Sequence, residues 1–397
     1  MDAVHVGSPR DGDGGGARLA GPGGPVGPVG PSPAGPAVIT GLGAVLPTGL
    51  GEAAIQALVQ PAGPGAPSWS QPRAVVGYDP AGILGPRGLR GLDRTTLLLL
   101  GAAALALAQA GPGPGWDAWD GLGLVVASAS AGLNSAAEFY REAVTLGARY
   151  VDPGRFPSVM VNAAASRAGM RFSARACQLT LAGAETGGPE AVDCARTLLR
   201  SGRARAMLVA AVEELSPLLS ALRPASGEGA VALVLEPWEE AVARRARTLA
   251  QVMGFGAATA GADGPDPAPS NGEDRDCDGP GGAEGLARAG ARAVRLALLQ
   301  SGTAPGEVEA VFSGTAPDHP LAEVERRALE QGLGGRQPPR VEVKRVLGES
   351  LAAASLAQVA ACAQALSQGG PRRGLVHCLG RNGQAAALVL GAVEGGG

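Results

Sequence analysis

The chain has 397 residues, 45% of them apolar and only 3% aromatic, so it can bury a large core packed mainly with Ala, Val and Leu. Its 33 basic and 36 acidic residues form no basic stripe, which argues against a nucleic-acid partner. The five cysteines are scattered without metal-ligand spacing, so we expect no metal site, no cofactor and a reduced, cytoplasmic setting.

The N-terminal segment is rich in Gly and Pro and lacks the basic and apolar regions of a signal peptide. We therefore expect residues 1–36 to be a disordered extension. The longest apolar run, Leu97 to Ala108, has about 12 residues, whereas a membrane-spanning helix needs roughly 20. This run predicts a buried helix, and we expect no membrane association.

Strands and helices alternate from residue 37 onward. A short apolar run closed by glycines, 37–43, predicts a strand that is buried on both faces. Similar patterns predict strands at 123–127, 207–212 and 230–235 and helices at 94–110, 136–146 and 190–201. This alternation indicates an α/β fold with right-handed crossovers around a largely parallel sheet.

The composition changes after Gly256. Residues 257–285 are rich in Gly, Pro, Asp and Asn without periodicity, and they predict a flexible loop. The alternation then resumes with helices at 286–300, 322–331 and 351–367 and strands at 308–312, 341–345, 375–379 and 385–390. We interpret 37–256 and 286–397 as two similar halves that share a core.

Several short segments resemble, in order along the chain, the motifs of the β-ketoacyl synthases, the condensing enzymes of fatty-acid and polyketide assembly. They are Val38-Ile-Thr-Gly-Leu-Gly-Ala44, Gly91-Leu-Asp-Arg94, Asn162-Ala-Ala-Ala165, Gly227-Glu-Gly-Ala230, Val234-Leu-Glu236, Gly314-Thr315 and Gly383-Gln-Ala-Ala386. The resemblance implies a thiolase-like five-layer αβαβα fold, built from two similar halves and normally dimeric. It also implies catalysis by a Cys on a tight turn, two His residues and a nearby Lys.

The family's nucleophilic Cys position falls on Glu185, within Gly183-Ala-Glu-Thr-Gly-Gly188. A carboxylate cannot replace a thiolate in forming a stable thioester. The surrounding small residues remain, as a sharp turn requires whatever side chain it carries. A simple role for Glu185, as an acidic residue that favours a helix N-terminus, is as reasonable as a specific one.

Both catalytic His positions are changed as well. The first, in the family's His-Gly-Thr motif, is Ser313, and His319 six residues later is either a displaced catalytic group or a plain loop histidine. The second His position is Glu349. Lys344, the only lysine of the chain, stands where the family keeps its Lys; it either has a catalytic task or neutralises buried acids.

Two loops that shape the acyl pocket in active members also differ. The segment before the Gly-Glu-Gly motif is shortened to Glu214–Ser226, and the C-terminal glycine loop reads Gly380-Arg-Asn-Gly383. We expect Glu185, Glu349 and Lys344 to meet in one pocket, where the ammonium relieves the repulsion between two carboxylates.

A ketosynthase-like chain without its Cys resembles the chain length factors of type II polyketide systems. The resemblance implies a non-catalytic subunit that forms a heterodimer with an active β-ketoacyl synthase, shapes the acyl tunnel and meets an acyl carrier protein, in type II polyketide or fatty-acid-like biosynthesis. The strand Cys177–Leu181 matches the family's central dimer strand.

Two alternatives stay open at the level of sequence. One is a residual decarboxylase or acyltransferase that uses Glu185, Lys344 or His319. The other is a ligand-binding or scaffold protein unrelated to acyl chains. The sequence does not name the partner, the acyl length or the product, and it does not decide between a homodimer and a heterodimer.

Overall fold

The strands lie in one mixed sheet. The computed structural model describes residues 35–60, 71–111, 121–222, 226–261 and 282–393. Within these ranges the strands are β1 Ala37–Leu46, β2 Gly49–Leu50, β3 Leu122–Ala127, β4 Gln178–Leu181, β5 Ala206–Glu213, β6 Gly229–Pro237, β7 Ala250–Thr259, β8 Ala310–Ser313, β9 Arg340–Val341, β10 Arg373–Leu379 and β11 Gln384–Gly391. Their order is β4-β3-β5-β6-β1-β7-β11-β10-β8-β9, and β2 pairs with β1.

The sheet consists of two halves with the same pattern. In the first, β3 pairs parallel to β4 and β5, and β6 pairs antiparallel to β5 and β1. In the second, β8 pairs parallel to β9 and β10, and β11 pairs antiparallel to β10 and β7. Two similar halves are therefore present, but the predicted largely parallel sheet is wrong, because each half contains antiparallel pairs.

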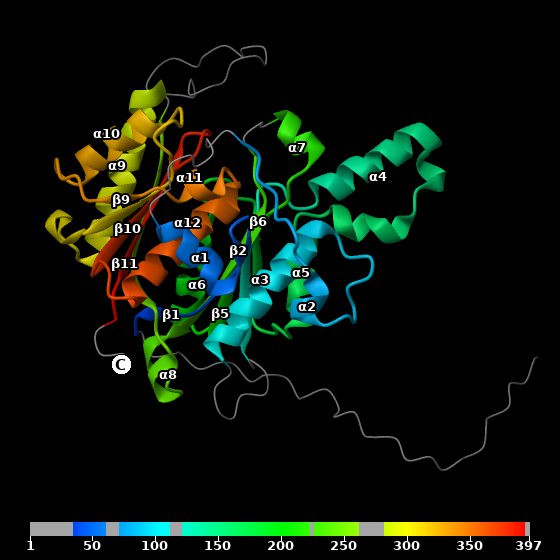
Figure 1. The fold of residues 1–397 in the computed structure, drawn as a ribbon, viewed down its shortest axis with the longest axis horizontal. Coiled ribbons are helices and arrows are strands. Elements are labelled where there is room, and N and C mark those ends of the chain that lie inside the picture. Colours follow the sequence, from blue (N-terminus) through cyan, green and yellow to red (C-terminus); the bar gives the residue numbers. More distant parts are fainter. Residues whose placement is uncertain (1–34, 61–70, 112–120, 223–225, 262–281, 394–397) are drawn as a thin grey trace, which may run out of the picture.

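Helices separate and cover the two halves of the sheet (Figure 1). They are α1 Gly51–Val59, α2 Pro80–Leu84, α3 Arg94–Ala110, α4 Leu133–Leu146, α5 Ala163–Arg171, α6 Gly187–Arg200, α7 Pro217–Leu222, α8 Trp238–Ala243, α9 Gly282–Ser301, α10 Ala322–Gly332, α11 Val343–Leu347 and α12 Leu351–Ser367, with 3₁₀ turns η1 Ala148–Tyr150, η2 Pro153–Val159 and η3 Pro305–Glu307. α6 and α12 lie between the halves in the largest core cluster. α3 and α5 cover one outer face, and α9 and α10 cover the other. This gives the predicted five layers.

Glycines on β1 and β7 allow the outer helices to approach closely. A Cβ on Gly43 would lie 2.1 Å from the carbonyl oxygen of Ala102 in α3. A Cβ on Gly256 would lie 2.2 Å from the carbonyl oxygen of Ala293 in α9. In both halves, therefore, a glycine on a strand lets a helix approach closely at an alanine. This repeated contact agrees with two halves of similar structure.

Most predicted elements are confirmed, and some boundaries change. The structure reproduces the predicted helices 94–110 and 351–367 to the residue. The predicted strand 341–345 is wrong, because Val343–Leu347 is the helix α11. β7 was missed; it runs across the predicted end of the first half, and α9 begins earlier than predicted, at Gly282.

Some expectations fall on residues that the structure does not describe. These are the disordered extension, apart from residues 35 and 36, and the part of the predicted loop at 262–281. Among the described helices, none is both long and apolar enough to cross a membrane.

Candidate functional site

The turn that carries Glu185 joins β4 to α6. Glu185 is buried, with 4% of its surface exposed. A Cβ on Gly183 would lie only 2.9 Å from the Cα of Gly187, the first residue of α6. The turn is therefore tight, as its small residues indicate, and it carries a buried carboxylate at the position that the sequence predicts to correspond to the family's Cys.

Gly188 brings the start of α6 against α12. A Cβ at this position would lie 2.3 Å from the backbone nitrogen of Leu356. The Gly188 N–H donates a hydrogen bond to Oγ of Ser355 at 2.9 Å. The φ of Gly188 is not in the left-handed region, so the backbone conformation does not require a glycine. The glycine is needed because any side chain would collide with the backbone of α12.

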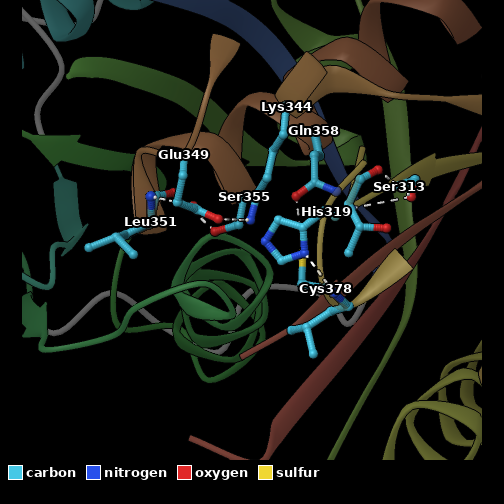
Figure 2. A network of polar contacts seen from close by, with 12 residues as sticks. Ser313, His319, Lys344, Glu349, Leu351, Ser355, Gln358 and Cys378 are labelled. Atoms are coloured by element: carbon cyan, nitrogen blue, oxygen red, sulfur yellow. Dashed lines mark hydrogen bonds and ion pairs between the residues drawn. The ribbon is translucent and has the colours of Figure 1, made fainter. Parts of the chain in front are cut away.

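Lys344 and Glu349 form a buried ion pair, and Figure 2 shows their side chains pointing toward each other. Nζ of Lys344 lies 2.8 Å from Oε2 of Glu349, and the side chains are 4% and 11% exposed. The other oxygen, Oε1, accepts a hydrogen bond from the Leu351 N–H at 2.9 Å. Leu351 has a φ of 46°, a left-handed conformation that costs a non-glycine residue about 1 kcal/mol.

Electrostatics place Glu185 beside this pair. Burial alone would lower the pKa of Lys344, but the carboxylates of Glu349 and Glu185 and the hydrogen bond to Glu349 raise it above its ordinary value. Lys344 therefore remains charged at physiological pH. The structure thus brings Glu185, Lys344 and Glu349 into one cluster, as the sequence predicts.

His319 lies in the same cluster, just before α10. Its Nδ1 accepts a hydrogen bond from the Leu321 N–H at 3.0 Å. Burial, followed by the positive charges of Lys344 and Arg381, lowers the pKa of His319 to about 4. The imidazole is therefore neutral at physiological pH, and its proton is on Nε2 because Nδ1 is an acceptor.

Ser313, at the first His position, belongs to a second polar network. Its hydroxyl donates to the buried carboxylate of Glu325 on α10. Glu325 also accepts from the N–H groups of Gly314 and Thr315, at 3.0 and 3.2 Å. Its Oε1 lies 2.9 Å from Nδ1 of His377 on β10. Ser313 therefore supports the loop that follows β8.

The pKa of Glu325 reflects this network. Burial would raise the pKa, but the hydrogen bond and charge of His377 and the hydroxyls of Ser313 and Thr315 lower it to about 2. Sequence reasoning missed the pairing of Glu325 with His377. The only signal is the register that places His377 opposite Ser313 on neighbouring parallel strands, and this register is visible only in the fold.

Cys378 is a second residue that the sequence did not single out. It lies within electrostatic range of Lys344, and burial raises the pKa of its thiol far above the ordinary value. The thiol donates a hydrogen bond to Oε1 of Gln358 at 3.2 Å. A buried, protonated thiol is a poor nucleophile, so Cys378 does not replace the family's missing Cys.

The comparisons with known proteins agree with this geometry. A family model described as Beta-ketoacyl synthase, N-terminal domain, matches residues 80–226. The solved structure of the ishigamide ketosynthase/chain length factor superposes with a TM-score of 0.70 and 28% identity, over 90% of this chain and 100% of that chain. Residues 80–226 thus match the β-ketoacyl synthases, and the thiolase-like fold of these proteins agrees with the two similar halves.

Curated relatives extend the comparison. The 3-oxoacyl-(acyl-carrier-protein) synthase 2 proteins of Mycobacterium tuberculosis and Mycobacterium bovis are each 29% identical over 265 residues, which is 58% of this chain and 58% of each relative. The match therefore spans less than two thirds of these relatives' length.

Two further solved structures support the fold alone. A β-ketoacyl synthase from Burkholderia phymatum has a TM-score of 0.75 at 19% identity, over 91% of this chain and 100% of that chain. The complex AntDE:AntF, described as a type II PKS acyl-carrier protein with its ketosynthase bound to the hexaketide, has a TM-score of 0.71 at 21% identity, with the same coverage.

Proposed function

We propose that this β-ketoacyl synthase relative is a non-catalytic subunit of the chain length factor type. It pairs with an active β-ketoacyl synthase, helps to shape the tunnel for the growing acyl chain, and meets an acyl carrier protein in type II polyketide or fatty-acid-like biosynthesis. The similarity to the ishigamide ketosynthase/chain length factor supports this class.

The observation that carries the proposal is the composition of the site cluster. Glu185 occupies the nucleophile turn, and Lys344 is held in an ion pair by Glu349. Condensation in this family needs a thiolate nucleophile and groups that polarise a carbonyl. The cluster offers a carboxylate and a neutralised ammonium at those positions, so we expect the thiolate to come from the partner.

The free edge of β4 supports the pairing. Among the described strands, β4 ends the sheet and pairs with β3 alone. Leu179 on this strand is 41% exposed. An open, apolar strand edge favours pairing with another chain. The family resemblance assigns the dimer contact to this strand, and the proposal adopts that assignment.

Co-expression with an active type II β-ketoacyl synthase tests the proposal, with condensation of malonyl groups on the acyl carrier protein as the assay. We expect activity that requires both chains, survives Glu185→Ala and disappears when the partner's nucleophilic Cys is changed to Ala. Glu190→Ala on the next turn of α6 is the matched control for a lost acidic side chain. Condensation by this chain alone, abolished by Glu185→Ala, would overturn the proposal.

A second candidate is a residual decarboxylase or acyltransferase. The observation that favours it is the neutral imidazole of His319 close to Lys344, because an N–H group and an ammonium can together polarise a thioester carbonyl. Release of CO₂ from malonyl carrier protein by the isolated chain, lost in His319→Asn and in Lys344→Met, would support this candidate. The subunit proposal predicts no release.

A further inference from the structure

A helical arm projects from the body of the molecule beside α3 and α5 (Figure 1). We define the arm as residues 133–160, which include α4, η1 and η2. No residue of α4 is buried. The arm instead exposes large apolar side chains, namely Tyr140 (72% exposed), Val144 (66%), Leu146 (62%), Tyr150 (64%), Phe156 (54%) and Met160 (47%). So much exposed apolar surface is typical of a contact with another protein.

The arm is braced internally. The rings of Phe139 on α4 and Phe156 on η2 pack edge to face, with centroids 5.9 Å apart. Arg155 on η2 forms ion pairs with Glu138 and Glu142 on α4. The two limbs therefore support each other, and the direction of the whole arm depends on how its root is held.

Glu213 holds one side of the root. It is the last residue of β5 and is fully buried. Its carboxylate accepts hydrogen bonds from the N–H groups of Ala129 and Ser130, at 2.6 and 3.0 Å, and from the hydroxyls of Ser130 and Ser128. All four donors belong to the short segment that leads from β3 into α4. One buried carboxylate thus fixes the chain just before the arm begins.

Glu214, the next residue, holds the arm itself. Its Oε1 accepts a hydrogen bond from the side-chain amide of Asn134 at 2.6 Å, and Asn134 is in the first turn of α4. Its Oε2 accepts one from the Thr95 hydroxyl at 2.7 Å, and Thr95 is in the first turn of α3. Glu214 therefore ties the start of the arm to a core helix.

We propose that Glu213 and Glu214 act together as an anchor that sets the direction of the arm, and through it the surface that the chain offers to its partner subunit. The first part concerns this chain alone. The second rests on the proposed function, because it assumes that the exposed arm contacts the ketosynthase partner.

The protonation of Glu213 provides a specific readout of the anchor. Burial raises the pKa of Glu213 to about 7, although the hydrogen bonds from Ala129, Ser130 and Ser128 oppose this. The pKa is raised in the closed anchor, so the closed anchor binds this proton more tightly than an opened, hydrated one does. Opening of the anchor is therefore more favourable above pH 7 than below it.

Other charged groups lie close to the anchor, and their ionisation must also be considered. Glu214 comes directly after the end of β5, and Glu228 comes directly before Gly229, the first residue of β6, which pairs with Glu213. Arg94 binds Glu228 and also feels the charge of Glu214. Glu228 and Arg94 stay ionised between pH 6 and 8: burial would raise the pKa of Glu228, but its contact with Arg94 lowers it, and the same contact raises the pKa of Arg94.

Amide hydrogen exchange of the isolated full chain tests the first part. We expect Glu213→Gln, Glu214→Gln and Ser130→Ala to reduce protection of the arm selectively, by about tenfold for each charge-assisted hydrogen bond lost. After correction for intrinsic exchange, protection of the arm in the wild type is expected to rise as the pH falls from 8 to 6, and in Glu213→Gln to be independent of pH.

Glu236→Gln is the matched control. Glu236 is equally buried at the other end of β6, where it is paired with Arg244 and has no contact with the arm. We expect it to lower protection throughout the core without a selective effect on residues 133–160. Unchanged arm protection in Glu213→Gln and Glu214→Gln would overturn the anchor, and so would a loss spread evenly over the chain as in the control.

Co-purification with the partner ketosynthase tests the second part. We expect Glu213→Gln and Glu214→Gln to weaken pairing and Glu236→Gln to leave it intact in the folded fraction. An arm that loosens without any loss of pairing would overturn the link to the partner surface. A wild-type chain that does not pair at all would instead contradict the proposed function, and the exchange result on the isolated chain would stand independently.

Discussion

The ammonium of Lys344 is the positive charge that faces the two carboxylates of the site cluster. Lys344 is the only lysine among 33 basic residues, and it is buried against two carboxylates. Removing one partner of a buried ion pair leaves an uncompensated charge, which costs about 3–5 kcal/mol. The role of this residue can therefore be measured as stability even if the chain has no activity.

We expect Lys344→Met to lower the free energy of unfolding by several kcal/mol at pH 8 and by less at pH 5, because protonation relieves the two carboxylates that the substitution leaves behind. Urea unfolding at both pH values measures this. Arg345→Met, on the exposed side of the same helix, is the control and should cost less than 1 kcal/mol. Unchanged stability of Lys344→Met from pH 5 to 8 would refute the charge-neutralising role.

His319 adds a separate pH dependence. Its folded pKa of about 4 lies below the ordinary value of 6.5, so the unfolded chain binds this proton first as the pH falls. The resulting stability is present above pH 6.5 and is lost toward pH 4. At 1.36 kcal/mol per pH unit, this difference in pKa corresponds to about 3 kcal/mol.

We expect His319→Asn to remove this part of the acid sensitivity, because Asn retains an acceptor for the Leu321 N–H but does not titrate. Glu213 acts in the opposite sense: its raised pKa stabilises the fold below pH 4.5, and this stabilisation is lost as the pH rises through about 7. Unfolding of wild type, His319→Asn and Glu213→Gln between pH 4 and 8 separates the two. Parallel curves for wild type and His319→Asn would contradict the assignment.

At the scale of elements, local pattern determines some structures and tertiary packing determines others. The helix α12 has a continuous run of small and apolar residues and is buried over nearly its whole length, so the sequence predicts its bounds. α11 carries Val343 and Val346, which favour a strand locally, but its helical turn buries Val343, Lys344 and Leu347 together. β7 was missed because Gly254 and Gly256 weaken any strand pattern, although the approach of α9 requires them.

The site divides in the same way. Glu185, Glu349 and Lys344 could be placed from motifs, because each motif lies on one turn or short helix. The partnership of Glu325 with His377 could not be predicted, since it joins a helix to a strand 52 residues away along the chain. The position of His319 in the cluster depends likewise on how α10 is packed.

The close contact between α6 and α12 at Gly188 gives a prediction at this scale. We expect Gly188→Ala to cost about 1–3 kcal/mol, because its Cβ would lie 2.3 Å from a backbone atom of α12 that cannot move alone. Gly187→Ala is the control, since its Cβ would meet the Ala352 Cβ at 3.3 Å and needs only a small adjustment. Equal unfolding free energies for the two variants would show that the helices are less tightly packed than the structure indicates.

At the scale of the whole molecule, duplication leaves two equivalent strand edges. β4 ends the sheet in the first half and β9 ends it in the second, each bonded to one described neighbour. Of these two edges, the proposed function assigns the partner to the β4 edge. The two edges therefore allow the same substitution to be made at a predicted contact and at its structural counterpart.

Thr180→Pro tests this assignment. The backbone N–H groups of Leu124 and Ser128, in the β3 segment, donate to the carbonyls of Cys177 and Leu181. Backbone groups alternate in direction along a strand, so the N–H and C=O of Thr180 point away from β3, toward the free edge. Proline at an edge position removes only the outward N–H and preserves the ladder to the neighbouring strand. We expect the variant to fold and to lose co-purification with the ketosynthase.

Arg340→Pro makes the same change on β9, where Val311 donates to Pro339 and Arg340 faces outward. We expect this variant to pair normally, since the proposed partner contacts the other edge. Each substitution removes one outward backbone N–H from a short edge strand, β4 with 4 residues or β9 with 2. The comparison therefore separates the loss of a partner contact from general damage to an edge strand. Loss of pairing in Arg340→Pro with normal pairing in Thr180→Pro would move the partner to the second half of the molecule.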